Sequence, residues 1–161
     1  MSKKRNGLRQ EDHDPEQLRR VLDAAKRNEL ATFIQAAFGI LNPGVVYKHN
    51  YHIEAIAYRL EQCARGEIRR LIVTVPPRSL KSLCASIAYP AFLLGHDPTR
   101  RIIAASYSSE LADNLHQLFR SVVASREYRR LFPGVRRKKA NEIEFRTSKG
   151  GFRYATSVGA R

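Results

Sequence analysis

Two short apolar runs limit the folds open to this chain more than any other feature. Residues 71–75 and 101–106 are rich in β-branched and small apolar residues, and neither run alternates with polar residues. Runs of this kind suit strands that are buried on both faces of a parallel sheet. Helical spacing follows each run, at about residues 82–89, where Pro90 should kink or restart the helix, and at about residues 109–124. The order of strand, helix, strand and helix predicts an α/β fold.

The segments on either side of this pattern have other periodicities. Residues 1–66 are mainly helical, with one helix that begins at Asp14-Pro15 and a second that spans about residues 52–64. Near the C-terminus, residues 141–154 alternate on both sides of a Gly-Gly turn, which predicts a β-hairpin. We therefore expect a helical N-terminal segment before the sheet and a hairpin after it.

The charge balance points to an anionic partner. The chain has 161 residues, and 29 Lys and Arg stand against 15 Asp and Glu, a formal net charge of +14. This excess is larger than solubility requires. Its densest run is Arg136-Arg137-Lys138-Lys139. The run either contacts DNA phosphates, without reading bases, or is a solvated loop.

Length and cysteine content narrow the class further. A chain of 161 residues is long enough for about one domain. Cys63 and Cys84 lie in helix-like stretches, and no Cys/His cluster has zinc spacing, so the sequence indicates neither a disulfide framework nor a structural metal. The longest apolar run is far shorter than the roughly 18 residues of a membrane span. We expect a soluble protein of a reducing cytoplasm, with no membrane partner.

The loop after the first apolar run has parts of a phosphate-binding loop but lacks its glycines. Such loops place backbone N–H groups, a helix N-terminus and a lysine around phosphates, while a hydroxyl binds magnesium. In Val75–Ser82, Lys81 and Ser82 supply the lysine and the hydroxyl, but Val75 and Leu80 stand where glycines are usual. The two prolines of the loop have no N–H to donate. The alternative is that Lys81 and Ser82 only open a solvent-facing helix.

The loop and its flanking segments resemble those of large terminase subunits, the ATPases that package DNA into the heads of tailed bacteriophages and prophages. A PPR-x-x-KS loop is usual in that family, and Pro76–Ser82 has this form. The resemblance covers roughly residues 45–161. The other segments that agree in order and spacing are residues 50–53, 66–72, 105–108, 131–133 and 149–159. The resemblance implies an incomplete three-layer sheet of the P-loop NTPase type, largely parallel, with a helical segment at 1–66 and the partial ATPase domain at 67–161.

The resemblance also implies roles for the loop residues. Lys81 would bind the β and γ phosphates, and Ser82 would bind the magnesium ion. Arg78 would be a catalytic arginine supplied in cis to the γ-phosphate, although it could equally be a surface arginine that steers anions. ATP and Mg²⁺ are the implied cofactors. The implied nucleotide-binding residues are Pro77, Arg78, Ser79, Leu80, Lys81, Ser82, Tyr51 and His52.

Two segments outside the loop match further motifs of the family. Tyr51 and His52 match the place where these ATPases contact adenine, and the alternative is a pair at a helix N-terminus that packs on the core. Ser106 and Tyr107 lie at the carboxyl end of the second apolar run, in a segment that would couple nucleotide state to DNA. The alternative there is an ordinary helix cap by Ser108 or the serine after it.

The implied partners are double-stranded DNA, the small terminase subunit, the portal of the procapsid and further copies of the chain in a ring, in the cytoplasm of a bacterial host. Two other function classes also fit the sequence. One is a helicase-like P-loop ATPase that nucleic acid stimulates. The other is a small basic DNA-binding protein without enzymatic activity, in which the Lys-Ser pair has no role.

Hydrolysis of ATP also requires one carboxylate that holds magnesium and another that polarises water. No apolar strand of this sequence ends in Asp-Asp or Asp-Glu, and terminases carry that pair beyond the Gly-Gly hairpin. The chain is thus expected to be the N-terminal part of a packaging ATPase, without that pair and without the nuclease domain. We predict that it releases no phosphate from Mg-ATP above background in a malachite-green assay. Magnesium-dependent release that is lost in Lys81→Ala would contradict this prediction.

Overall fold

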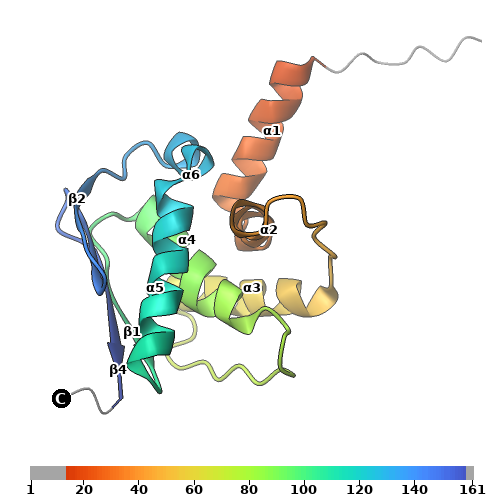
Figure 1. Cartoon of the computed structure of the whole chain (residues 1–161). Coiled ribbons are helices and arrows are strands. Elements are labelled where there is room, and N and C mark those ends of the chain that lie inside the picture. Colours follow the sequence, from red (N-terminus) through yellow and green to blue (C-terminus); the bar gives the residue numbers. More distant parts are fainter. Residues whose placement is uncertain (1–13, 159–161) are drawn as a thin grey trace, which may run out of the picture.

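The structure, a computed structural model that describes residues 14–158, has helices on one face of a small mixed sheet (Figure 1). The helices are α1 Pro15–Asn28, α2 Leu30–Leu41, α3 Tyr51–Ala64, the π-helix η1 Leu83–Ala88, α4 Tyr89–His96, α5 Ser109–Ala124 and α6 Arg126–Leu131. The strands are β1 Arg101–Ser106, β2 Arg137–Ala140, β3 Glu144–Thr147 and β4 Phe152–Ser157. The prediction of an α/β protein is confirmed.

Helix α1 begins where its capping residues predict. The side chain of Asp14 accepts a hydrogen bond of 3.1 Å from the backbone N–H of Glu16, and Pro15 lies in the first turn of α1. Glu29 is extended and divides the expected single helix into α1 and α2. Gly66 has a φ of +79° just after α3, as is common where a helix ends.

The strand order in the sheet is β1-β4-β3-β2. Only β1 and β4 are parallel, while β3 pairs antiparallel with both β4 and β2. The expected hairpin is confirmed as β3 and β4, but the expectation of a largely parallel sheet was wrong. The difference arises because the hairpin and β2 supply three of the four strands, and neighbours along the chain pair antiparallel through short turns.

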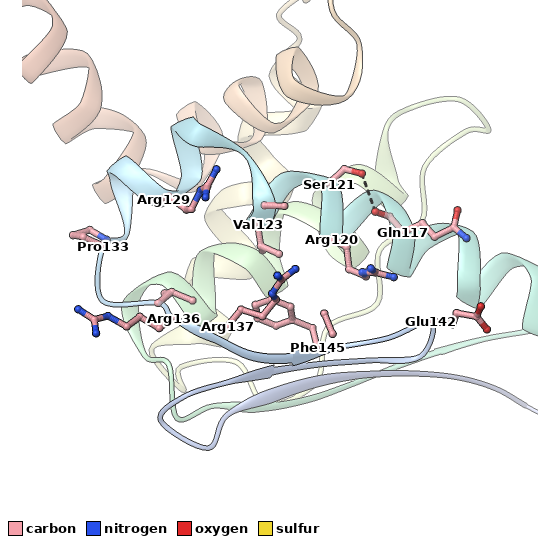
Figure 2. A pocket seen from close by; sticks show the side chains of 13 residues that line it. Gln117, Arg120, Ser121, Val123, Arg129, Pro133, Arg136, Arg137, Glu142 and Phe145 are labelled. Atoms are coloured by element: carbon pink, nitrogen blue, oxygen red, sulfur yellow. Dashed lines mark hydrogen bonds between the residues drawn. The ribbon is translucent and has the colours of Figure 1, made fainter.

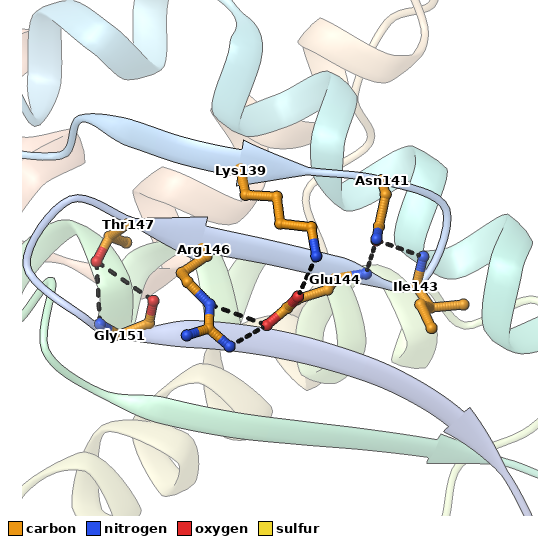
Figure 3. A network of polar contacts seen from close by, with 7 residues as sticks. All are labelled: Lys139, Asn141, Ile143, Glu144, Arg146, Thr147 and Gly151. Carbon is orange, nitrogen blue, oxygen red and sulfur yellow. Dashed lines mark hydrogen bonds and ion pairs between the residues drawn. The ribbon is translucent and has the colours of Figure 1, made fainter.

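Strand β2 contains most of the basic run that we considered as a solvated loop. Side-chain burial does not explain this strand, since Arg137, Lys138 and Lys139 are all exposed. Its turn into β3 is held by Asn141, whose Oδ1 accepts hydrogen bonds of 3.2 Å from Ile143 N and 2.7 Å from Glu144 N (Figure 3). Backbone pairing and this turn therefore form β2 without an apolar pattern in the sequence.

Both apolar runs alternate between half-buried and exposed residues. Residues 71–75 form no strand and pair with none in the described part of the chain. Ile72 is 91% exposed, and Ile103 in β1 is 71% exposed. The expectation of a strand at 101–106 is confirmed as β1, whereas the expected strand at 71–75 and the expected burial of both runs on both faces were wrong. The reason is that the helices cover a single face of the sheet, so that the structure has two layers instead of the expected three (Figure 1).

The hydrophobic core joins the N-terminal helices to the rest of the chain. Phe33 of α2 lies 5.7 Å from the ring of Phe92, 6.2 Å from that of Tyr128 and 5.7 Å from that of Phe132, measured between ring centroids. The Tyr128 hydroxyl donates a hydrogen bond of 2.9 Å to the carbonyl of Ala91. Helices before and after the sequence boundary at residue 66 thus share one core.

A buried polar link crosses this core. Arg153 of β4 is fully buried, with Nη1 2.7 Å from Nδ1 of His116 and Nη2 donating to the carbonyl of Ser86 at 3.1 Å. Its Cζ atom lies 4.8 Å from the ring centroid of Phe119, as in a cation–π contact. Burial and the charge of Arg153 lower the pKa of His116 to about 4, and burial lowers the pKa of Arg153 to about 10. His116 is therefore neutral at pH 7 and accepts a hydrogen bond from the arginine.

This link predicts a loss of stability in mild acid. Between pH 6.5 and about 4 the unfolded chain binds a proton at His116 that the folded chain does not, so the free energy of unfolding falls as pH falls. The shift corresponds to about 3 kcal/mol at most. His116→Asn keeps an acceptor for Arg153 but does not titrate. We expect its free energy of unfolding, from urea titrations at pH 7 and pH 4.5, to decrease less than that of the wild type. Equal decreases would contradict this assignment.

Candidate phosphate-binding loop

The Val75–Ser82 loop has the backbone conformation of a loop with glycines. The φ angles of Arg78 and Leu80 are +62° and +57°, and Ser79 between them has no positive φ. The left-handed conformation costs a residue with a side chain about 1–2 kcal/mol. Leu80 stands where a phosphate loop has its last glycine, and it adopts the conformation that glycine would adopt. Alternating handedness of this kind turns successive N–H groups toward one concave side, where an anion can bind.

The helix after the loop is also irregular. Lys81 and Ser82 are already helical, and the π-helix η1 follows them. Pro90 lies in the first turn of α4, the position predicted for it, at the point where the continuous helix changes from π to α. The carbonyl of Ser86 in η1 accepts a hydrogen bond of 3.1 Å from Arg153 of β4, so a strand of the sheet donates to this helix.

The loop lines a pocket of about 710 Å³. Arg78 and Lys81 are the charged residues of its lining, which includes no aspartate or glutamate among the described residues. Its apolar walls come mainly from α2, η1 and α5. They are formed by Phe38, Leu41, Leu83, Ile87, Leu115 and Leu118. The pocket therefore offers positive charge and apolar surface together, a combination suited to an anion that carries an organic group.

The structure brings the expected loop residues together but places the expected adenine-side pair outside the pocket. Pro77 to Ser82 all line it, whereas Tyr51 and His52 do not. Nε2 of His52 lies 3.2 Å from the carbonyl of Ser79, so this histidine supports the loop backbone from α3. Tyr51 is 80% exposed. Contact with adenine stays a prediction, while support of the loop by His52 is a role that the sequence did not indicate.

The expected coupling segment contains a helix cap. Ser106 ends β1, and the Ser108 side chain accepts a hydrogen bond of 3.2 Å from the N–H of Leu111 at the start of α5. The capping alternative is therefore confirmed for Ser108. Tyr107 between them is 82% exposed. A coupling role for Ser106 and Tyr107 stays a prediction, which a cap does not exclude.

The basic run does not form one patch. Arg136 and Arg137 line a second pocket, together with Arg120 from α5 and Arg129 from α6 (Figure 2). Lys138 and Lys139 are outside that lining.

Lys139 instead pairs with Glu144 at 3.3 Å (Figure 3). Glu144 also pairs with Arg146 at 2.6 Å. Arg146 and Lys139 hold the pKa of the Glu144 carboxyl below its usual value. The four residues of the basic run are adjacent in the sequence, but the structure places Arg136 and Arg137 in the second pocket and the two lysines outside it. The contributions of α5 and α6 to the second pocket could be found only from the fold.

Comparison of the chain with protein-family models, with curated proteins and with solved structures found no match. Within residues 14–158, no group of three or more His, Cys, Asp or Glu side chains is placed to hold a metal ion. No helix in the same range combines the length and apolar character that crossing a membrane requires. A function for this chain is therefore argued from the loop and its pocket.

The left-handed backbone of the loop leads to a prediction on stability. Arg78→Gly should relieve strain that Arg70→Gly, at an exposed position without a positive φ, does not relieve. We expect the free energies of unfolding of the two variants to differ by about 1–2 kcal/mol in favour of Arg78→Gly. Arg78→Val should be the least stable variant, because β-branched residues tolerate positive φ poorly. Urea denaturation followed by circular dichroism measures these differences, and equal values for the two glycine variants would contradict the strain.

Proposed function

We propose that the Val75–Ser82 loop binds the triphosphate of ATP, and that the chain is the ATPase portion of a DNA-packaging motor of the large terminase type. The observation that carries this proposal is the left-handed backbone of Leu80 directly before Lys81 and Ser82. Strained backbone of this kind is concentrated at ligand sites, where the strain holds donors in place before the ligand binds. A loop that only opened a helix would have no use for it.

The residues of the pocket fit a triphosphate. The backbone between Arg78 and Ser82 provides the N–H cradle, and the side chains of Arg78 and Lys81 add two positive charges to a lining without carboxylates in the described part of the chain. Arg78 reaches the phosphates from inside the loop, where its planar fork of donors can bind two oxygens. Lys81 supplies a point charge at the helix N-terminus, where the helix dipole also favours an anion.

The loop residues supply part of what a magnesium site requires. Ser82 offers a hydroxyl oxygen, which is a suitable ligand for this hard cation, and the phosphates themselves would supply others. A bound magnesium ion would neutralise part of the negative charge of the triphosphate. What the chain contributes is therefore the orientation of the triphosphate and one hydroxyl ligand.

We also propose that the sheet belongs to a three-layer fold of the P-loop NTPase type. In a three-layer P-loop NTPase the strand before the phosphate loop belongs to the sheet, and helices cover both faces. The exposed side chains of Ile72 and Ile103 support this architecture, since these apolar surfaces suit a further layer.

Double-stranded DNA is the proposed polymer partner, and the net charge of +14 supports it. Lys138 is the residue of the basic run that is exposed, lies outside the second pocket and forms no ion pair with described residues. The small terminase subunit, the procapsid portal and a ring of further copies, in a bacterial cytoplasm, follow from the resemblance in the loop and its flanking segments.

A thermal shift with Mg-ATP tests the nucleotide proposal. Ligand at about ten times its Kd should stabilise the folded chain by about 1.4 kcal/mol, which raises Tm by roughly 2–6 °C for a domain of this size. Lys81→Ala should abolish the shift, because it removes a charge that contacts the phosphates.

Lys149→Ala, which changes a lysine in the β3–β4 turn, is the matched control and should keep the shift. The proposal fails if 5 mM Mg-ATP leaves Tm unchanged, or if Lys81→Ala shifts as much as the wild type. DNA binding that weakens with salt, without any shift by ATP, would favour a basic DNA-binding protein that is not an enzyme.

A further inference from the structure

The second pocket, which we call the α5–β2 pocket, lies between helices α5 and α6 on one side and strands β2 and β3 on the other (Figure 2). It encloses about 950 Å³. The loop residues that the nucleotide proposal uses belong to a different pocket, and the two linings share no residue. A role for the α5–β2 pocket therefore does not depend on ATP binding.

Four arginines surround this pocket. Arg120 is half-buried, and its Nη1 donates to the carbonyl of Asn141 at 3.2 Å. Arg129, Arg136 and Arg137 are exposed. None of the four forms an ion pair with a residue in the range 14–158.

Glu142 is the single carboxylate among the lining residues in that range, so positive charge predominates. Each guanidinium keeps donors in a planar fork that matches a carboxylate.

The floor between the arginines is apolar. Val123 and Phe145, which are 8% and 4% exposed, lie at the bottom, and Val135 and Ala140 complete the apolar surface. A ligand that bound only through charge would leave this surface in contact with water. The pocket therefore fits a ligand with several negative charges and an apolar group between them.

One wall of the pocket is the end strand of the sheet. β2 pairs with β3 on one side and, within the described residues, with no strand on the other. Arg137 and Ala140 of this strand line the pocket. The backbone of an end strand is where an extended peptide can add as a further strand, with alternate side chains directed to one face. The three basic residues of β2 favour an acidic peptide over a second copy of this basic chain.

We propose that the α5–β2 pocket binds an extended acidic segment of a partner protein, with one apolar side chain on the floor and flanking carboxylates paired with the arginines. Duplex DNA matches these features less well. Its backbone is convex, and its phosphates carry no apolar group that could reach Val123 and Phe145.

Fluorescence anisotropy with a labelled nonapeptide, four glutamates on each side of one phenylalanine, tests this proposal. Ala124 is exposed at the end of α5 and lines the pocket, so Ala124→Phe fills the pocket without a change of charge. We expect binding to be weakened about tenfold or more in Ala124→Phe, and similarly in Arg120→Glu/Arg136→Glu. Replacing the phenylalanine of the probe with serine should also weaken binding about tenfold, since an apolar side chain contributes roughly this much.

Arg69→Glu/Arg70→Glu is the control, because it changes the net charge as much as the arginine pair does, at exposed positions outside both β2 and the pocket lining. It should leave binding of the peptide within about threefold of the wild type at 150 mM salt, where distant charges are screened. Circular dichroism verifies that each variant is folded.

The proposal is overturned if the probe does not bind at 1 mM, or if neither Ala124→Phe nor the serine probe weakens binding. It is also overturned if a labelled 20-base-pair duplex competes with the peptide and loses its own affinity in Ala124→Phe. That result would assign the pocket to DNA. Duplex binding that weakens in Lys138→Glu and not in Ala124→Phe would support separate surfaces for DNA and peptide.

Discussion

The hydrogen bond from Arg153 to the carbonyl of Ser86 connects the sheet to the helix that follows the loop. A buried guanidinium is costly unless polar groups surround it, and His116 and this carbonyl are the partners that the fold provides. This carbonyl belongs to the π-helix η1. β4, α5 and η1 are thus held together by one side chain, and the start of the helix at Lys81 is fixed relative to the sheet.

The strained loop depends on this attachment. Left-handed conformations at Arg78 and Leu80 persist only when the surrounding structure holds both ends of the loop. Before the loop, Val75 packs against the core, and after it η1 is held by the sheet. His52 supports the middle through the carbonyl of Ser79. The shape of the loop is therefore present without a ligand, so that a bound phosphate would not have to order it.

Sequence periodicity and turn residues predicted much of the fold. The helices at α3 and α5 and the hairpin of β3 and β4 have clear patterns, and the loop residues line one pocket as expected. Other features depend on partners that are distant in the chain. Residues 71–75 are as apolar as a buried strand, but burial on both faces also requires a second layer of helices. β2 has no apolar pattern, and Arg153 reads as a surface charge until the fold places it beside His116. The α5–β2 pocket combines arginines from three elements whose proximity no local pattern encodes.

The π-helix η1 also determines the relative orientation of the two ends of the continuous helix that runs from Lys81 to His96. An α-helix advances about 100° per residue. In a regular helix from Lys81 to His96, the number of residues alone would therefore fix the angle between the side chains at its two ends. The wider turns of η1 alter the rotation per residue in the middle of this helix. At one end of this helix Lys81 lines the pocket of the Val75–Ser82 loop, and at the other end Phe92 and His96 pack near the ring of Phe132. The π-helix between them thus sets the angle between the face that carries the lysine and the face that carries the aromatic cluster.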